Sequence, residues 1–311
     1  MNADPLTPAP TLAMVGLGRM GANMARRLAR GGAHVHGFDA QPEARTALAD
    51  EPGVVLHASL ADAVAALPAP RTVWLMLPAG EPSETALAEL VARLAPGDLV
   101  VDGANANYLD SQRHARELAA HGLRFADCGV SGGVWGLANG YCLMYGADAE
   151  AAARLAPVAR LLAPAPDRGW LHCGPPGSGH FVKMIHNGIE YGAMQAYAEG
   201  FALLEGKTEF DLDLAAVGEL WRHGSVVRSW LLDLTVDALR DPGALDAVAP
   251  YVADSGEGRW TVDESVRQGT PAPVIALALM TRFASQGRAD VGNRLLSLMR
   301  KGFGGHAVKT K

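Results

Sequence analysis

Short apolar runs alternate with amphipathic segments of helical period along the first half of the chain. Bounded apolar runs are typical of buried strands, and their alternation with helices predicts βαβ units and a mostly parallel sheet. We therefore expect an α/β domain with a doubly wound sheet. Its predicted strands are residues 11–17, 33–38, 54–56, 71–77, 98–102, 123–127, 142–146 and 170–173, and the helices predicted between them include 20–31, 84–94 and 111–121.

The pattern changes at the breaker-rich stretch Pro175-Pro176-Gly177-Ser178-Gly179. A long helical pattern follows from His180 to about Lys207, and several shorter helices end near Met299. Breakers between two patterns are typical of a domain boundary. We therefore expect an α/β domain at residues 11–176 and an all-helical domain at 177–299.

Both ends of the chain differ from these domains. Residues 1–10 have no positive charge and no apolar run, so we expect a short disordered lead and not a signal peptide. The stretch 300–311 is rich in glycine and basic residues. We expect it to be an arm that docks elsewhere and is not helical.

The composition excludes several classes of protein. The net charge of −6 with scattered basic residues argues against nucleic acid as the main partner. No apolar stretch is long enough to span a membrane, and no ligand cluster predicts a metal site. The three cysteines (Cys128, Cys142 and Cys173) have no metal-binding spacing and are expected to be reduced core thiols of a cytoplasmic protein, with nothing nearby to activate them.

The segment Gly16-Leu-Gly-Arg-Met-Gly21 has the G-x-G-x-x-G spacing of a Rossmann-type dinucleotide site. It follows a predicted strand and opens a predicted helix, whose N-terminus stabilises a pyrophosphate. Asp39 ends the next strand, where a carboxylate accepts hydrogen bonds from ribose hydroxyls and repels a 2′-phosphate. No arginine is adjacent in sequence, so we expect NAD to bind and NADP to bind more weakly. The alternative is a glycine turn without ligand. The predicted cofactor residues are Gly16, Leu17, Gly18, Arg19, Met20, Gly21, Asp39, Leu77, Pro78 and Asn105.

Lys183, His186, Asn187 and Glu190 are spaced to share one helix face. Buried polar groups need partners, so such a face is unusual for a core helix. Lys183 is a candidate base for alcohol oxidation, and Glu190, two turns on, a candidate acid. His186 and Asn187 are candidate substrate ligands. The alternative is a solvated lysine–glutamate pair beside a core histidine.

Two small-residue loops follow predicted strands. Gly129-Val-Ser-Gly-Gly133 exposes backbone N–H groups and a hydroxyl, which suits a carboxylate or phosphate, although a structural turn is equally consistent. Asp102-Gly-Ala-Asn105 ends a strand where ligands bind in open sheets, so Asn105 is a candidate bridge between cofactor and substrate. The candidate cationic residues are Arg259 (in a compact loop with Thr261), Arg282, Arg300 and His306. Composition does not separate them from surface residues.

Together these segments resemble the 6-phosphogluconate dehydrogenase family, the decarboxylating branch of the β-hydroxyacid dehydrogenase superfamily. The resemblance runs from Thr11 to Lys309 and is most specific at His180–Tyr191, because other members of the superfamily lack the downstream glutamate. The chain resembles the short, NAD-preferring bacterial form, which lacks the second half of the long form's helical domain. The other segments that carry the resemblance are 16–21, 102–105, 130–133, 256–261 and 303–306.

The resemblance implies a reaction of the pentose phosphate pathway type. Lys183 would take the proton of the substrate 3-hydroxyl as hydride leaves for the nicotinamide, and the resulting keto acid would lose CO₂. Glu190 would then protonate C1 and give ribulose 5-phosphate. The implied substrate-binding residues are Asn105, Ser131, Gly132, Gly133, His186, Asn187, Tyr191, Arg259, Thr261, Arg282, Arg300 and His306.

The resemblance also implies a homo-oligomer, because Arg300 and His306 match tail residues that reach a neighbouring subunit's site. Dimer and tetramer, and action in cis or in trans, remain open. Val134-Trp135 stands where long forms have acidic residues, so a carboxylate–nicotinamide contact is not carried over. The rival functions are a β-hydroxyacid dehydrogenase without decarboxylation and a catalytically silent NAD-binding protein.

Overall fold

The computed structural model describes residues 9–288, 290–304 and 307–309. The chain divides into two compact units, the first ending at Met184 and the second beginning at Ile185. The division falls inside the long helix α8 (Ser178–Gly206), whereas the expected boundary at 176/177 lies just before this helix begins. One continuous helix therefore belongs to both units.

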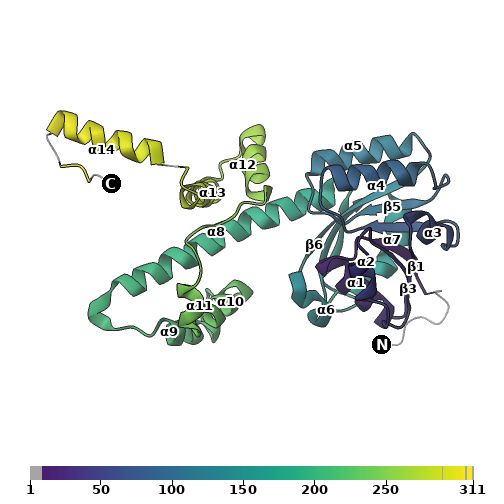
Figure 1. Ribbon diagram of the computed structural model, residues 1–311, viewed down its shortest axis with the longest axis horizontal. Helices are drawn as coiled ribbons and strands as arrows, with labels where there is room; N and C mark the ends of the chain where they lie inside the picture. Colours follow the sequence, from purple (N-terminus) through teal and green to yellow (C-terminus); the bar gives the residue numbers. More distant parts are fainter. Residues whose placement is uncertain (1–8, 289, 305–306, 310–311) are drawn as a thin grey trace. The chain divides into compact units, whose positions relative to one another are not determined.

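The first unit is an α/β domain around one sheet (Figure 1). Within the described residues the sheet has the strand order β3-β2-β1-β4-β5-β6-β7-β8. Among these pairs β6–β7 is antiparallel and all the others are parallel. The prediction of a mostly parallel sheet is therefore confirmed. The strands are β1 (Thr11–Val15), β2 (His34–Phe38), β3 (Val54–Leu56), β4 (Thr72–Leu75), β5 (Leu99–Asp102), β6 (Arg124–Ser131), β7 (Cys142–Ala147) and β8 (Trp170–Gly174).

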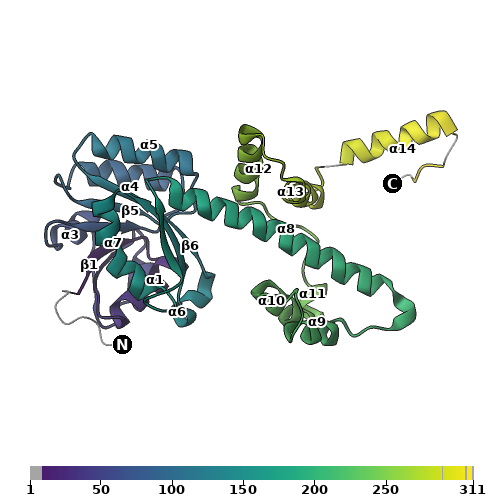
Figure 2. The same ribbon diagram turned by 180° about the vertical axis from the view of Figure 1, so that it is seen from behind.

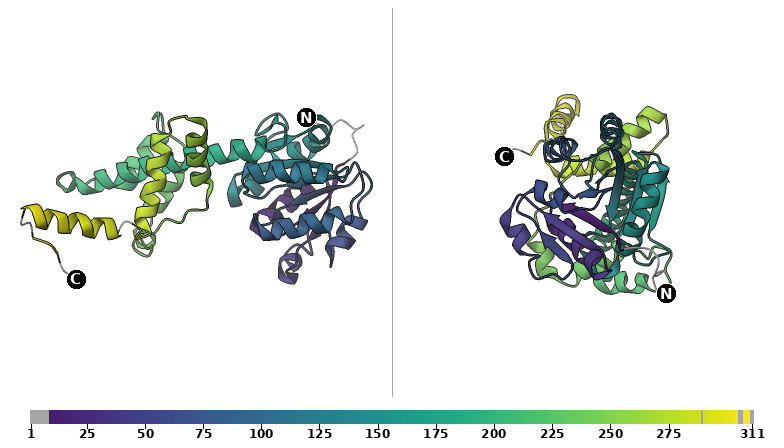
Figure 3. Two further views of the ribbon diagram at one scale, coloured as in Figure 1. Left: turned by 90° about the horizontal axis from the view of Figure 1, so that it is seen from above. Right: turned by 90° about the vertical axis from the view of Figure 1, so that its right-hand side faces the viewer.

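Helices cover both faces of this sheet (Figure 3). Alternate residues of β1 point to opposite faces, so Leu12 and Met14 enter one core while Ala13 and Val15 enter the other. The first core includes side chains of α1 and α7, and the second includes side chains of α3, α4 and α5. The helices of this unit before α8 are α1 (Arg19–Arg30), α2 (Pro42–Thr46), α3 (Leu60–Ala65), α4 (Glu81–Val91), α5 (Tyr108–Ala119), α6 (Gly136–Asn139) and α7 (Ala149–Leu162), with a 3₁₀ turn η1 (Gly133–Trp135).

Side-chain caps explain where several of these helices begin. Ser59 accepts a hydrogen bond from Asp62 N at the start of α3, and Asn107 does the same from Leu109 N at α5. Asp148 accepts from two N–H groups at the start of α7. Helix α1 has no such cap and no acidic residue in its first turn. No capping side chain would therefore compete with an anion for its first N–H groups.

Two expectations about the sheet need correction. The sixth strand was expected to end at Asp127 but continues to Ser131, because antiparallel pairing with β7 adds partners for its last residues. Three core thiols were expected, but only Cys128 is buried, whereas Cys142 is exposed and Cys173 is partly exposed. Cys142 is the first residue of β7 and pairs with Ser131, the last residue of β6, so it lies at the end of the strand and not in its middle. Burial raises the pKa of the Cys128 thiol well above its usual range.

The second unit consists of helices and connecting loops, and no strand occurs among its described residues (Figure 2). Tyr191, Ala278 and Leu279 form one small core, and Phe201, Leu232 and Val236 form another. Besides the later part of α8, the unit contains η2 (Thr208–Phe210), α9 (Leu214–Arg222), α10 (Trp230–Leu239), α11 (Pro242–Asp246), α12 (Glu257–Gln268), α13 (Pro273–Ser285) and α14 (Asp290–Gly304).

Helix α14 extends into the segment that was expected to be a non-helical arm. Residues 300–304 are helical, so the expectation of a non-helical arm is wrong for them. The sequence before Arg300 has an acidic residue in the first turn and recurrent apolar positions, and Lys301 lies in the last turn, where it complements the helix dipole. These signals outweigh the glycines at 302 and 304.

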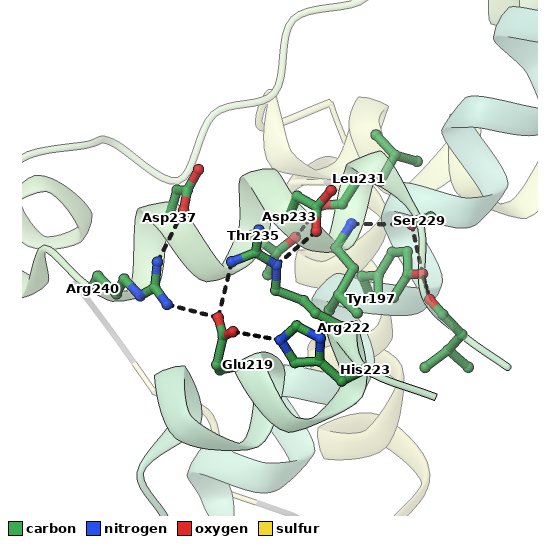
Figure 4. A network of polar contacts seen from close by, with 12 residues as sticks. Tyr197, Glu219, Arg222, His223, Ser229, Leu231, Asp233, Thr235, Asp237 and Arg240 are labelled. Carbon is green, nitrogen blue, oxygen red and sulfur yellow. Dashed lines mark hydrogen bonds and ion pairs between the residues drawn. The ribbon is translucent and has the colours of Figure 1, made fainter. Parts of the chain in front are cut away.

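An ion-pair network joins α9 to α10 (Figure 4). Glu219 accepts hydrogen bonds from Arg222, His223 and Arg240, and Arg222 also pairs with Asp233 at 2.8 Å. Shared partners hold the two helices together around the Phe201 core. These groups lie toward solvent, so the network contributes little more than a few weak ion pairs.

Two searches of the described residues were negative. No helix there is long and apolar enough to cross a bilayer. No group of three or more His, Cys, Asp or Glu side chains in the described part of the chain has an arrangement that could hold a metal ion.

A cluster on α4 and α5 generates a stability prediction. Glu84 accepts hydrogen bonds from Arg113 at 2.5 Å and pairs with His114 at 2.9 Å. The hydrogen bond from Arg113 is the main reason why the pKa of Glu84 falls to about 2. Because the carboxyl is 43% exposed, solvent screening limits the gain, and Glu84→Gln should lower the free energy of unfolding by about 0.5–1 kcal/mol at pH 7.

A depressed carboxyl pKa stabilises the fold above the unfolded pKa of 4.5 and loses this effect as the pH falls toward about 2. Urea denaturation of both proteins between pH 7 and pH 2.5 should therefore show the difference narrowing in the acid range. A difference that stays constant down to pH 2.5 would contradict the assignment.

Candidate active site

The glycine-rich loop between β1 and α1 lies at the carboxyl end of the parallel strands. Gly16 has φ +91°, and a Cβ there would lie 2.4 Å from Met76 O. A Cβ on Gly21 would lie 1.9 Å from Gly16 O, so the turn requires glycine at both positions. By contrast, a Cβ on Gly18 would meet nothing within 4 Å. The loop backbone is thus tightly packed at Gly16 and Gly21. At Gly18, in front of the uncapped start of α1, space remains beside the backbone.

Asp39 follows β2 beside this loop. Its Oδ2 accepts a hydrogen bond from Leu17 N at 2.6 Å, and its Oδ1 accepts one from Gln41 N at 2.8 Å. The carboxylate is therefore held against the glycine loop in the position where a ribose is recognised in this type of fold. The Arg45 guanidinium, from α2, donates to the backbone carbonyl of Asp39. A cation therefore lies near Asp39 in space, although none is adjacent in sequence.

The remaining cofactor candidates lie on neighbouring strand ends. Leu77 follows β4, and its Cδ2 would be 3.0 Å from a Cβ on Gly16, while Pro78 O accepts a hydrogen bond from Ser83. Asn105 follows β5 and is exposed. Its loop is fixed because Asp102 Oδ1 accepts a hydrogen bond from Ala104 N at 3.0 Å. The expected cofactor residues of β1, β4 and β5 thus share the carboxyl edge of the sheet.

The Ser131-Gly132-Gly133 loop follows the end of β6. Gly132 and Gly133 have φ values of +125° and +53°, which side chains rarely adopt. The turn that follows brings Gly136 against the ring of the buried Tyr141, leaving no room for a Cβ. The loop is therefore a structural turn, and its two glycines leave the backbone there without side-chain cover.

Lys183 lies on α8 in the part that belongs to the first unit. A Cβ on Gly129 of β6 would lie 2.3 Å from Lys183 Cβ, so the lysine stem lies directly against the strand. Cys142 is next to Ser131 in the β6–β7 ladder, and its thiol is within reach of the lysine's charge. Burial nevertheless raises the pKa of Cys142, and Lys183 only partly offsets this. The thiol therefore has a charged neighbour that the sequence did not reveal, yet it is not activated.

The other three residues of the polar set lie on α8 in the second unit. His186 Nδ1 is 3.0 Å from Asn187 Oδ1 and 3.8 Å from Glu190 Oε2. The side chains of His186 and Glu190 are 38% and 40% exposed, so neither is a core residue. The helical spacing of the four residues is thus confirmed, and the alternative of His186 as a core histidine is wrong.

Three residues expected to bind phosphate meet in the second unit. The Arg282 guanidinium stacks on Tyr191, 3.5 Å from the ring centroid, and the Arg259 guanidinium stacks on Phe283. Arg259 Nε also pairs with Asp254, whose other oxygen is 3.4 Å from Tyr191 OH. Burial alone would raise the pKa of Asp254, but hydrogen bonds from Arg259 and Gly256 N–H outweigh it and lower this pKa. The cluster thus combines two guanidinium groups with the ionised carboxylate of Asp254.

The remaining expected residues do not join this cluster in the same way. Thr261 is buried, packs on Gly188, and donates its hydroxyl hydrogen to Glu257 O at 2.9 Å. Arg300 is exposed on α14. His306 lies outside the described residues.

Sequence reasoning missed Arg45, Asp127 and Asp254. Arg45 is only six residues from Asp39, but the short helix α2 that carries it was not among the predicted helices. Asp254 opens an Asp-Ser-Gly turn before the Gly256–Thr261 loop, which was a usable signal. Asp127 was visible as a single acid in the otherwise apolar strand Phe125–Cys128, and a buried charge of this kind calls for partners.

Comparisons with known proteins agree with this geometry. Residues 11–168 match the family described as the NAD binding domain of 6-phosphogluconate dehydrogenase, and residues 179–307 match its C-terminal domain. An NAD⁺-dependent decarboxylating 6-phosphogluconate dehydrogenase of Haloferax volcanii is 43% identical over 96% of this chain and 99% of its own length.

Longer relatives share the same core. The NAD⁺-dependent decarboxylating enzyme of Bacillus subtilis is 31% identical over 88% of this chain, which spans 61% of that protein. A 6-phosphogluconate dehydrogenase structure from Plasmodium falciparum superposes with a TM-score of 0.82 at 24% identity, covering 97% of this chain and 66% of the other, and supports the fold alone.

The contacts of Asp39 generate a prediction about nucleotide choice. Asp39→Ala removes the carboxylate that would accept the ribose hydroxyls, and it should lower the preference for NADH over NADPH, expressed as the dissociation constant of NADPH divided by that of NADH, by about tenfold or more. Titration of protein fluorescence with NADH and NADPH measures this ratio. Arg45→Ala is the matched control, because it removes the nearby cation and should shift the ratio further toward NADH. An unchanged ratio in Asp39→Ala would mean that nucleotide choice lies elsewhere.

Proposed function

The chain belongs to the 6-phosphogluconate dehydrogenase family, and we propose that it oxidises and decarboxylates 6-phosphogluconate to ribulose 5-phosphate and CO₂ with NAD as the hydride acceptor. The observation that carries this proposal is that Lys183 and Glu190 both lie on α8. A lysine packed against β6 and a glutamate two turns on supply a base and an acid from one helix. A simple alcohol dehydrogenase needs only the base.

The glycine loop fits a dinucleotide. The uncapped start of α1, the open position at Gly18 and the carboxylate of Asp39 match a pyrophosphate and a ribose in turn. When bound, NAD supplies the hydride acceptor. Arg19 and Met20 begin α1, so their N–H groups belong to the anion-binding turn together with Leu17 and the three glycines. Leu77, Pro78 and Asn105 complete the proposed cofactor residues.

We assign the proton transfers to two residues. Lys183 in its neutral form accepts the proton of the 3-hydroxyl while the C3–H bond breaks, which leaves a 3-keto acid. The ammonium of Lys183 then donates a hydrogen bond to the ketone oxygen, and the C1–C2 bond breaks with loss of CO₂. The electron pair of the broken bond forms an enediolate, and Glu190 donates a proton to the carbon that becomes C1 of the product while the ketone re-forms at the neighbouring carbon.

The remaining contacts divide between the two ends of the substrate. Ser131, Gly132, Gly133 and Asn105 suit the carboxylate end, and His186 and Asn187 suit the hydroxyls. Tyr191, Arg259 and Arg282 suit the phosphate, because guanidinium groups bind phosphate with several donors. Thr261 has its hydroxyl directed at Glu257 O, so its proposed contact with phosphate requires the hydroxyl to rotate.

We propose that the active form is a homo-oligomer, a dimer or a tetramer, in which Arg300 and His306 complete a neighbouring subunit's site. Large apolar side chains of α13 and α14 support this proposal, because Val274, Leu277, Leu295 and Leu298 are each more than half exposed. The free thiols of Cys128, Cys142 and Cys173 suit a cytoplasmic enzyme.

The first test of the proposal is a coupled assay. NADH formation and CO₂ release with 6-phosphogluconate should be equimolar and faster with NAD than with NADP. Gluconate is the matched control, and loss of the phosphate should raise KM by about a hundredfold or more if the arginine cluster binds it. NADH without CO₂ would support a β-hydroxyacid dehydrogenase that does not decarboxylate. NAD binding without turnover of any sugar acid would support a silent binding protein.

Two substitutions separate the proposed proton transfers. Lys183→Met should lower kcat by about a thousandfold or more, because no base remains for the hydroxyl, while NADH binding stays unchanged. Glu190→Gln should slow the formation of ribulose 5-phosphate by about a hundredfold but leave the first turnover of NADH formation nearly intact. Rapid-quench kinetics measure both steps. Equal loss of both steps in Glu190→Gln would contradict the separate roles.

A further inference from the structure

The start of α8 is fixed by a carboxylate buried inside the sheet. Asp127, on β6, is fully buried. Its Oδ1 accepts a hydrogen bond from Gly177 N at 2.5 Å, and its Oδ2 accepts one from His180 N at 2.7 Å. Gly177 immediately precedes α8 and His180 lies in its first turn, where no preceding turn supplies carbonyl partners for the N–H groups. The two oxygens of Asp127 therefore cap this helix from a neighbouring element.

Glycines allow the helix to approach the strands this closely. A Cβ on Gly179 would lie 2.5 Å from Met144 O and 2.6 Å from Asp127 O. A Cβ on Gly146 of β7 would lie 2.6 Å from Asp127 Oδ1. No side chain fits at either position, so the first turn of α8 lies directly on the backbones of β6 and β7.

The surroundings of Asp127 are polar as well as buried. Asp102 of β5 is in register with it, and His180 Nδ1 lies 2.7 Å from Ser111 Oγ of α5. Burial raises the pKa of Asp127, while the nearby His180 and the N–H groups of Gly177 and His180 oppose this rise. A charge that is costly to bury is retained here in front of a helix N-terminus, where the dipole favours it.

Lys183 is the next residue along this helix that carries chemistry. It follows His180 by about one turn, and its stem lies against Gly129, two residues beyond Asp127 on β6. The strand therefore fixes the helix at two points, with the cap at Asp127 and the packing contact at Gly129. Rotation or sliding of α8 would break the hydrogen bonds to Asp127 and move the ammonium group of Lys183.

We propose that Asp127 is a positioning residue for Lys183, an inference that rests on the proposed role of Lys183 as the base. Asp127 touches neither substrate nor cofactor. It sets the axial position and the rotation of α8, and through them the place of the lysine nitrogen. A misplacement of about 1 Å in a proton-transfer group can lower a rate by about a hundredfold.

The test compares two helix caps of the same chemistry. Asp127→Asn keeps the shape but replaces one acceptor oxygen with an NH₂ group that faces an N–H. Asp148→Asn is the matched control, because Asp148 caps α7 through Glu150 N and Ala151 N, both at 2.9 Å, and α7 carries no proposed catalytic residue. Asp127→Ser, which keeps one acceptor oxygen, is the second variant if Asp127→Asn does not fold.

We expect Asp127→Asn to lower kcat by about tenfold or more, while KM and the NADH dissociation constant change by less than about threefold. The deuterium isotope effect on kcat with 3-deuterated substrate should rise, because oxidation becomes slower than product release. Amide exchange of residues 177–184 should accelerate. None of these changes should occur in Asp148→Asn, since a loss of global stability alone does not alter an isotope effect.

A folded Asp127→Asn protein with kcat within about twofold of the wild type would overturn the inference, as would an equal loss in Asp148→Asn. If the wild type does not turn over 6-phosphogluconate, the proposed function fails separately. The positioning claim is then tested by labelling Lys183 with an amine-reactive ester, read by mass spectrometry. The labelling rate should change by about threefold or more in Asp127→Asn and stay constant in Asp148→Asn, and equal rates in all three proteins would overturn the claim.

Discussion

The direct packing of the first turn of α8 on β6 and β7 is the contact on which the arrangement of the candidate catalytic residues depends. It requires glycine at 129, 146 and 179, because a Cβ at any of these positions would overlap neighbouring atoms. It also requires an acceptor for the helix N–H groups that the sheet would otherwise leave unpaired, and Asp127 supplies it. Three glycines and one buried carboxylate together determine where Lys183 lies.

The two units offer different kinds of candidate anion-binding group. In the first unit the candidate anion-binding groups are backbone N–H groups, at the uncapped start of α1 and in the Ser131–Gly133 loop. In the second unit the candidates are the guanidinium groups of Arg259 and Arg282, and Arg259 pairs with the carboxylate of Asp254. Backbone donors suit a group that approaches the chain closely, such as a pyrophosphate or a carboxylate. Guanidinium groups reach further and bind a terminal phosphate with several donors.

Asp254 gives the guanidinium cluster a defined geometry at an electrostatic cost. Its carboxylate orders Arg259 and lies near Tyr191 OH, yet it also offsets part of the positive charge. Arg282 is ordered differently, by stacking on Tyr191 and by a hydrogen bond from Nη1 to Ala253 O at 2.9 Å. A pre-ordered donor loses less side-chain entropy on binding, which favours such an arrangement even at reduced net charge.

The sequence by itself determined the fold class, the dinucleotide loop and the spacing of Lys183, His186, Asn187 and Glu190, because each depends on local periodicity or on glycines within a few residues. It also placed each strand end to within a few residues, except at β6, where pairing with β7 extends the strand. Only the tertiary structure decided which distant groups meet. Asp127 accepts hydrogen bonds from residues at the start of α8 some fifty positions later, and Asp254 lies 3.4 Å from the hydroxyl of Tyr191, 63 positions earlier. Such contacts arise from chain topology and burial, and a short window of sequence contains neither.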